Sequence, residues 1–231
     1  MATTSIGAPG VTFPDSTVQT TAGATGVPVI NVYTSPGTWT KPSTVKAIKV
    51  TITGGGAGGT TANQPGGSPT TINQGAGGGA GGTAIRVYPA SSLPGPGPQP
   101  YTIGAAVAAN TSGNPSSFGN PSITILTANA GEVGRTNSPG GFYGYGGGGG
   151  TASGGQINMR GGPGTQGGLA SSNSVGGTGG ASFFDGGGNS NPNSPTINSG
   201  QYGSGGAGES SPGLSSIGGG GSGIIVIEEF Y

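Results

Sequence analysis

Short runs of apolar and β-branched residues recur along this chain at wide intervals, and they predict β-strands. The clearest run is 45–53, where Ile48, Val50 and Ile52 alternate with polar side chains. A two-residue period of this kind is typical of a strand that buries one face. Comparable runs lie at 29–33, 84–88, 101–104 and 122–128.

The last run, 224–230, is apolar on both faces, which predicts a strand in the middle of a packed sheet. Glu228 and Glu229 are neighbours in this strand, so their side chains should face opposite sides of the sheet. Trp39, between the first two runs, is interpreted as a core residue.

Blocks of glycine separate the predicted strands, and glycine makes up 58 of the 231 residues. They are much longer than hairpin loops, which usually have about 2–5 residues. No helix is expected, because each interior glycine costs about 1 kcal/mol relative to alanine. The blocks suit a polyproline-II conformation, whose three residues per turn point N–H and C=O groups outward, towards neighbouring chains. The blocks lie at 54–59, 75–82, 140–150, 154–188 and 200–223.

The predicted fold is therefore all-β: a small β-sandwich or jelly-roll-like base with long glycine-rich, polyproline-II-type insertions and almost no helix. Backbone hydrogen bonds between the glycine segments would have to offset the entropy lost on ordering them. Residues 1–30 hold little that could form a core, so we interpret them as an attachment or stem segment, with a flexible tail as the alternative. Residues 31–231 form the sandwich and glycine-rich domain.

The composition excludes several classes of protein. Six basic and six acidic residues give a net charge of zero, whereas a nucleic-acid binder needs a basic stripe. No apolar run reaches the roughly 18–20 residues that insertion into a membrane requires. Cysteine and histidine are absent, which removes disulfides, thiolate metal sites and the commonest general base.

Four segments resemble those of bacteriophage tail-fibre and receptor-binding proteins that carry a C-terminal glycine-rich, polyglycine-helix domain. Residues 10–22 read GVTFPDSTVQTTA, with Ser16 where that family usually has glycine. Residues 33–42, YTSPGTWTKP, precede a strand and then GGGAGG, as at the start of the family's glycine-rich domain. The similarity continues through 77–87 and 117–119 and ends in the closing strand, SGIIVIEEFY, at 222–231.

The resemblance implies a virion protein of the tail fibre or tail tip. Its partners would be other virion tail or fibre proteins and a host-cell surface receptor, either a glycan or an outer-membrane component. A homotrimer is implied, and Phe13, Pro14 and Asp15 belong to the attachment motif. Similar polyglycine-helix tips occur in the adhesins of T-even-type phages. The N-terminal segment of this chain differs from that of those adhesins.

Aromatic residues inside the glycine blocks are the candidates for receptor binding at loop tips, because aromatic faces stack on sugars or apolar loops and lose little entropy on ordering. The alternative is that these side chains brace the glycine segments. An apolar and cationic pair and one acidic residue accompany them. The candidates are Phe142, Tyr143, Tyr145, Met159, Arg160, Phe183, Phe184, Asp185 and Tyr202.

Catalysis and cofactor binding find little support in the sequence. A glycosidase needs two inward carboxylates roughly 5–10 Å apart, but the carboxylates here are scattered, so no enzyme activity is expected. Asp185 with Asn189 and Asn191 could suggest calcium, but a turn is favoured. No metal or other cofactor is predicted.

The function predicted is non-enzymatic binding of a host receptor by a phage tail-fibre or tail-tip protein. The main alternative is a purely structural virion part, such as a fibre segment, tail adaptor or capsid decoration protein. A non-viral matrix or ice-binding protein and an accessory depolymerase are weaker alternatives.

Overall fold

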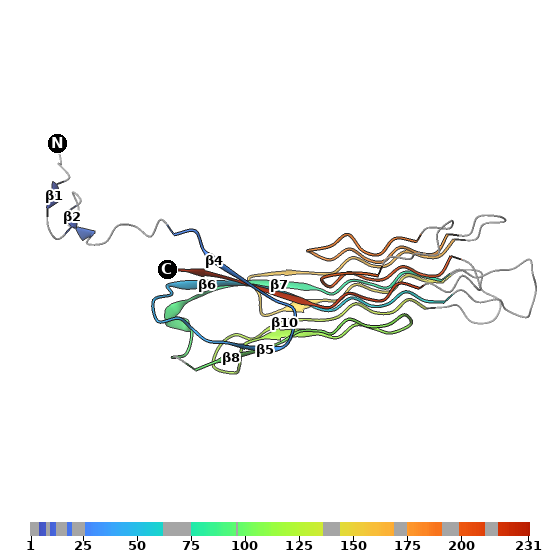
Figure 1. Cartoon of the computed structure of the whole chain (residues 1–231), viewed down its shortest axis with the longest axis horizontal. Coiled ribbons are helices and arrows are strands. Elements are labelled where there is room, and N and C mark those ends of the chain that lie inside the picture. Colours follow the sequence, from blue (N-terminus) through green and yellow to red (C-terminus); the bar gives the residue numbers. More distant parts are fainter. Residues whose placement is uncertain are drawn as a thin grey trace, which may run out of the picture.

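In a computed structural model, the chain forms an elongated body with strands at one end and long glycine rods at the other (Figure 1). The C-terminus lies at the strand end, away from the rods (Figure 1). The structure describes the residues 5–7, 10–12, 18–19, 26–61, 75–95, 97–135, 144–168, 175–190, 199–210 and 217–231.

Two antiparallel five-stranded sheets pack face to face, which confirms the predicted all-β, sandwich-like fold. The first sheet has the order β12 (Ile157–Met159), β7 (Thr83–Pro89), β6 (Ala47–Thr53), β13 (Ile224–Phe230) and β4 (Val29–Tyr33). The second has the order β11 (Ala152–Ser153), β10 (Leu126–Ala128), β9 (Ser116–Phe118), β8 (Gln99–Thr102) and β5 (Gly37–Trp39). A separate small sheet contains β1 (Ser5–Gly7), β2 (Gly10–Thr12) and β3 (Val18–Gln19).

The core lies between the two large sheets. Ile48, Val50 and Ile52 of β6 are fully buried, as their alternation predicts. Phe118 of β9 faces them from the second sheet, and its ring centroid lies 6.0 Å from that of Tyr88. Burial of each such side chain contributes about 1.5–3 kcal/mol, so this layer provides most of the cohesion of the sandwich.

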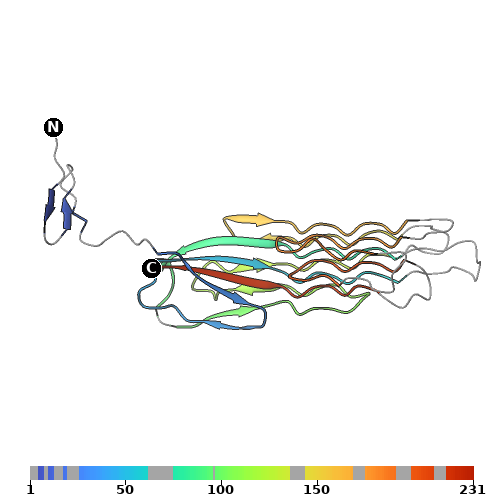
Figure 2. The ribbon, with the colours of Figure 1, turned by 45° about the horizontal axis from the view of Figure 1, so that its top comes forward.

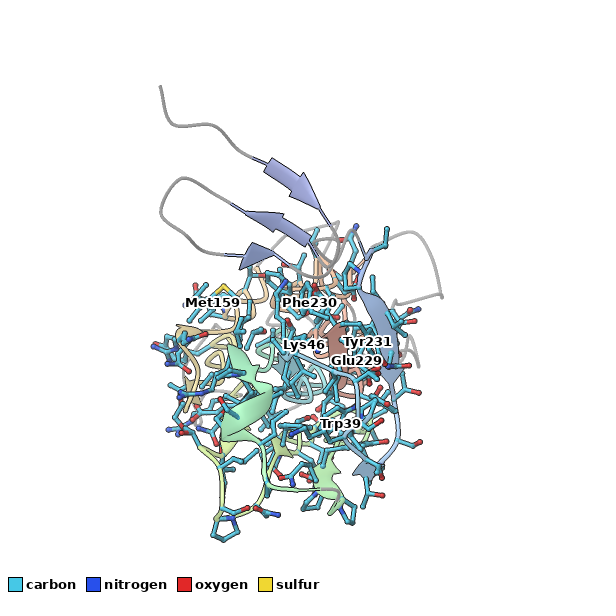
Figure 3. The ribbon with its side chains drawn as sticks, turned by 90° about the vertical axis from the view of Figure 1, so that its left-hand side faces the viewer. Trp39, Lys46, Met159, Glu229, Phe230 and Tyr231 are labelled. Carbon is cyan, nitrogen blue, oxygen red and sulfur yellow. The ribbon has the colours of Figure 1, made fainter. Side chains whose placement is uncertain are left out.

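The C-terminal strand β13 lies between β6 and β4, which confirms its predicted interior position. Its two carboxylates face opposite sides, as expected. Glu228 forms an ion pair of 2.8 Å with Lys49 on the outer face. Glu229 accepts a hydrogen bond of 2.7 Å from the indole N–H of Trp39 in the core (Figure 3). Trp39 is buried, as predicted.

The predicted strand limits agree with the structure in some places and fail in others. The run 122–128 forms a strand only from Leu126, because Asn120 ends a turn by accepting a hydrogen bond from the Ser122 N–H. β12 lies inside the block 154–188, where no strand was expected. Its three residues are too few to produce a visible alternation.

Helix is nearly absent from the part of the chain that the structure describes. It contains one 3-10 turn, Ala90–Ser92. No helix among these residues is long and apolar enough to span a membrane.

The glycine segments form rods with a three-residue period, as the polyproline-II prediction requires. In the rod 54–61, every third N–H from Gly54 donates to the rod 75–82. The next N–H of each triplet donates to the segment 110–115, and the last donates to the segment 217–223. These bonds have N···O distances of 2.9–3.0 Å, so the three faces of one rod hold three different neighbours.

The rod 75–82 is the centre of the resulting lattice, and all of its residues are buried. The rods lie side by side and continue the strands of the first sheet, from β6 outward and back into β7 and β13 (Figure 2). The central rod therefore has six neighbours and no exposed side. It donates hydrogen bonds to 128–135, 160–168 and 199–210, and accepts them from 54–61, 144–151 and 175–181.

Candidate functional site

The end of the lattice away from the sandwich, here called the distal end, is one candidate site. Tyr145 and Arg135 lie there on adjacent rods, and each backbone N–H donates to the other residue's carbonyl, at 2.8 and 2.9 Å. In an antiparallel pair of this kind both side chains project to the same side. The phenol ring of Tyr145 is 53% exposed and Arg135 is exposed as well.

This arrangement brings together one residue that the sequence singles out and one that it does not. Tyr145 was predicted from its place in a glycine block, whereas Arg135 lies outside the blocks. The antiparallel bridge that pairs them has no sequence signal. The other predicted residues of that block, Phe142 and Tyr143, lie outside the described residues, as do Phe13, Pro14 and Asp15 of the attachment motif.

The remaining aromatic candidates lie at the opposite end of the lattice, next to the sandwich. Phe183, Phe184 and Asp185 belong to the turn 182–187, and Tyr202 belongs to the turn 200–204. We call these two the proximal turns. A Cβ added at Gly203 would overlap the side chain of Thr53, the last residue of β6. These aromatic residues were expected at loop tips, but their turns lie where the rods meet the sheet.

Polar side chains clasp the two proximal turns together. The carboxylate of Asp185 accepts hydrogen bonds from the Ser204 hydroxyl at 2.5 Å and from the Gln201 N–H at 3.0 Å. The hydroxyl of Ser182 donates to the Tyr202 carbonyl at 2.8 Å. The turns are thus fixed to each other without any contribution from their aromatic rings.

The environment of Asp185 favours its charged form. Burial acts to raise the pKa of this carboxyl group, but hydrogen bonds from Ser204 and from the backbone N–H groups of Gln201, Gly186 and Gly187 act the other way. The net effect is a pKa below the ordinary value. The carboxylate therefore acts as a fixed acceptor within the clasp. That role agrees with the turn favoured at this position, and Asn191 lies outside the described residues.

The aromatic rings of the proximal turns face solvent. Phe183 is 53% exposed and Phe184 is 37% exposed, and their rings meet edge to face with centroids 4.9 Å apart. Tyr202 is 42% exposed and has a φ of 43°, which is unusual and strained for a bulky residue. The clasp holds three large rings at the surface, so they are available to a partner.

Met159 and Arg160 lie at the edge of the sandwich and do not reach the distal end. Met159 ends β12 and projects from the border of the first sheet (Figure 3). The Arg160 guanidinium Nε donates a hydrogen bond of 3.0 Å to the carbonyl of Gly149 on the neighbouring rod. This arginine therefore braces two rods where they leave the sheet.

The described part of the chain contains no group of three or more Asp and Glu residues that could hold a metal ion. Glu228 and Glu229 are held by Lys49 and by Trp39 with Tyr231, on opposite faces of one strand.

No protein-family model matches the chain, and no curated protein matches it either.

Proposed function

We propose that this chain is a non-enzymatic phage tail-fibre or tail-tip protein that binds a host-cell surface receptor, a glycan or an outer-membrane component. The observation that carries the proposal is the lattice itself. It projects from the sandwich on the side opposite the C-terminus (Figure 1). Its described rods end on that far side at residues 61, 135, 168, 190 and 210. This is the shape of a support that presents connecting segments at a distance from its attachment point.

The lattice supports this role because backbone, and not side chains, holds it together. Most of the bonds between rods join a backbone N–H to a backbone C=O, so the arrangement of the rods depends little on the sequence that connects them at the distal end. Binding residues are often placed on loops that a rigid scaffold positions. Tyr145 beside Arg135 offers a stacking surface and a donor of hydrogen bonds in this region.

The sequence of the connecting segments indicates what kind of contact they would make. They contain no Lys, Arg, Asp or Glu and are rich in Asn, Ser, Thr and Pro. Recognition would then depend on amides, hydroxyls, aromatic rings and backbone groups, with Arg135 as the nearby cation. These segments are 62–74, 136–143, 169–174, 191–198 and 211–216.

The N-terminal segment would join the chain to other tail or fibre proteins of the particle. Its motif around Phe13, Pro14 and Asp15 is the part that resembles attachment sequences. A purely structural role in the virion, without receptor contact, is the alternative function.

The test is binding of the purified, fluorescently labelled full chain to a panel of bacterial strains, with competition against phage adsorption. Saturable binding that blocks adsorption supports the proposal. The double variant Arg135→Ala with Tyr145→Ala should weaken this binding at least about tenfold, whereas Ile125→Ala, an exposed residue on the sandwich, should leave it unchanged. Absence of binding to strains that the phage infects would favour the structural role.

A further inference from the structure

The outer face of the first sheet is unusually apolar, and its exposed apolar side chains lie along its two edges, on either side of a central Thr51 that is only 4% exposed. One row of paired positions crosses all five strands. At its two ends, Val32 and Ile157 are 57% and 54% exposed. Antiparallel sheets that face water normally place polar residues on that side. The row consists of Val32, Val226, Thr51, Ile85 and Ile157.

The next row of paired positions on this face holds one positive and one negative residue. They are the charged residues of the face among the described strand positions, and their charges cancel. Lys49 and Glu228 are directly paired and form the ion pair of 2.8 Å. Ile30 and Val87 flank them and are exposed. The face therefore carries no net charge.

The proximal turns extend this face towards the lattice. Gly203 packs on the side chain of Thr53, which lies on the outer side of β6, and the turn therefore closes the lattice end of the face. The exposed rings of Phe183, Phe184 and Tyr202 belong to these turns. In Figure 3, Phe230 and Met159 mark the outer side of the first sheet, and Trp39 and Glu229 mark the core side. The turns lie on that same outer side in Figure 1.

We propose that this face, including the proximal turns, packs against the same face of a second copy of the chain. A flat sheet face is fully covered by one partner sheet at about 10 Å, whereas three flat faces around a threefold axis leave wedges open. The pairing is isologous, so an excess charge on the strands would repel its own copy, and the strand positions of this face carry none. The charged group of the proximal turns, Asp185, is held by hydrogen bonds from Ser204 and Gln201 within its own chain. A twofold axis parallel to the long axis of the molecule would relate the two copies and keep both lattices pointing the same way.

The area is sufficient for such a pair. Strands about 4.8 Å apart with about 3.4 Å per residue give the sheet face about 500 Å² per copy, or about 1,000 Å² for the pair. The proximal turns add to this figure, and a stable specific interface needs about 1,000 Å² or more. Exposed aromatic side chains are also the residue type that interface centres favour. The pair differs from the trimer that the family resemblance implies.

The test is the mass of the full chain in solution, measured by sedimentation velocity across a hundredfold range of protein concentration. The proposal predicts a species of twice the chain mass of 21.6 kDa. Val87→Glu should raise the dimer dissociation constant by on the order of 100-fold, because it adds one negative charge to the face of each copy beside Lys49, which Glu228 already holds, and the dimer would bury both added charges. Val175→Glu is the matched control, because Val175 is 44% exposed and Val87 is 42% exposed, but Val175 lies on a lattice rod away from the sheet.

Phe183→Ala combined with Phe184→Ala provides a second variant that leaves the sandwich intact. It should also weaken the dimer, while circular dichroism and the unfolding temperature stay close to those of the unchanged chain. A monomer at all concentrations, a trimer, or a dimer that Val87→Glu leaves unchanged would each overturn the proposal. None of these outcomes depends on receptor binding, so the result is independent of the proposed function.

Discussion

Replacing Gly78 with alanine should destabilise the protein severely, because Gly78 lies in the fully enclosed rod. Its N–H donates to the Gly206 carbonyl at 2.9 Å, and its carbonyl accepts from the Gly180 N–H at 2.8 Å. A Cβ at this position would overlap the backbone of Ala57 and Gly58 on the adjacent rod. A backbone obstacle cannot rotate away as a side chain can, so the rods 54–61 and 75–82 would have to separate.

The size of the effect follows from the hydrogen bonds that separation would break. The bonds of this pair of rods include those from the Ala57 N–H to Gly79 and from the Thr60 N–H to Ala76, both 2.9 Å. Each broken bond leaves buried groups without a partner at a cost of about 1–3 kcal/mol, so losing both bonds costs about 2–6 kcal/mol. Alanine restricts the unfolded chain and returns about 0.4–1 kcal/mol. The net loss is about 1–6 kcal/mol, which is a substantial part of the stability of a typical domain.

Gly168→Ala is the matched control on another rod. A Cβ at Gly168 would meet no atom within 4 Å, and its φ lies outside the left-handed region. We expect it to change stability by less than about 1 kcal/mol. For a protein of this size, 1 kcal/mol corresponds to about 2–4 °C in unfolding temperature. Gly78→Ala should therefore unfold on the order of 10 °C below Gly168→Ala in a thermal scan followed by circular dichroism. Equal unfolding temperatures would refute the claim that close backbone contact holds the lattice together.

Three further predictions concern the sandwich and the proximal turns. Trp39→Phe should cost about 1–3 kcal/mol in denaturant unfolding, because it removes the donor that serves the buried Glu229 carboxylate; an unchanged midpoint would contradict this. Burial, opposed only in part by Arg86, raises the pKa of Tyr88 to about 12, so ultraviolet titration should show one tyrosine ionising there. Its contribution to stability is complete below its ordinary pKa of 10.0 and is lost as pH rises through about 12. The lowered pKa of Asp185 predicts the opposite direction: Asp185→Asn should be less stable than the unchanged chain at neutral pH, and the difference should disappear as pH falls below the ordinary carboxyl value of 3.8. A difference that persists at lower pH would show that the charge of Asp185 does not matter.

Local patterns were enough to predict β6, β7 and β13 of the first sheet, but they missed β5, β9 and β11 of the second sheet. The alternation in β6 and the two apolar faces of β13 each specify a position relative to the core, and the structure confirms both. β12 could not be found in this way, since Ile157–Met159 is held in the sheet by pairing with β7 and not by a pattern of its own. Pairing with a strand that is distant in the sequence depends on the tertiary fold, and a local pattern does not show it.

The glycine lattice was predictable as a type of structure but not as an arrangement. Backbone groups without side chains must bond to neighbouring backbone, which leads to rods with a three-residue period. Which rods become neighbours is not encoded in any side chain, because glycine has none to distinguish one partner from another. The position of Phe183 and Phe184 next to the sandwich depends on how often the chain reverses, and that number is not visible in the sequence.

Adsorption competition tests the central claim most directly. The purified full chain, added at increasing concentration to cells of a susceptible strain, should reduce phage adsorption in a saturable way. The double variant Arg135→Ala with Tyr145→Ala should need at least about ten times more protein for the same reduction, with Ile125→Ala matching the unchanged chain. Folded protein that neither binds these cells nor slows adsorption at any concentration would contradict a receptor-binding role for the distal end of the lattice.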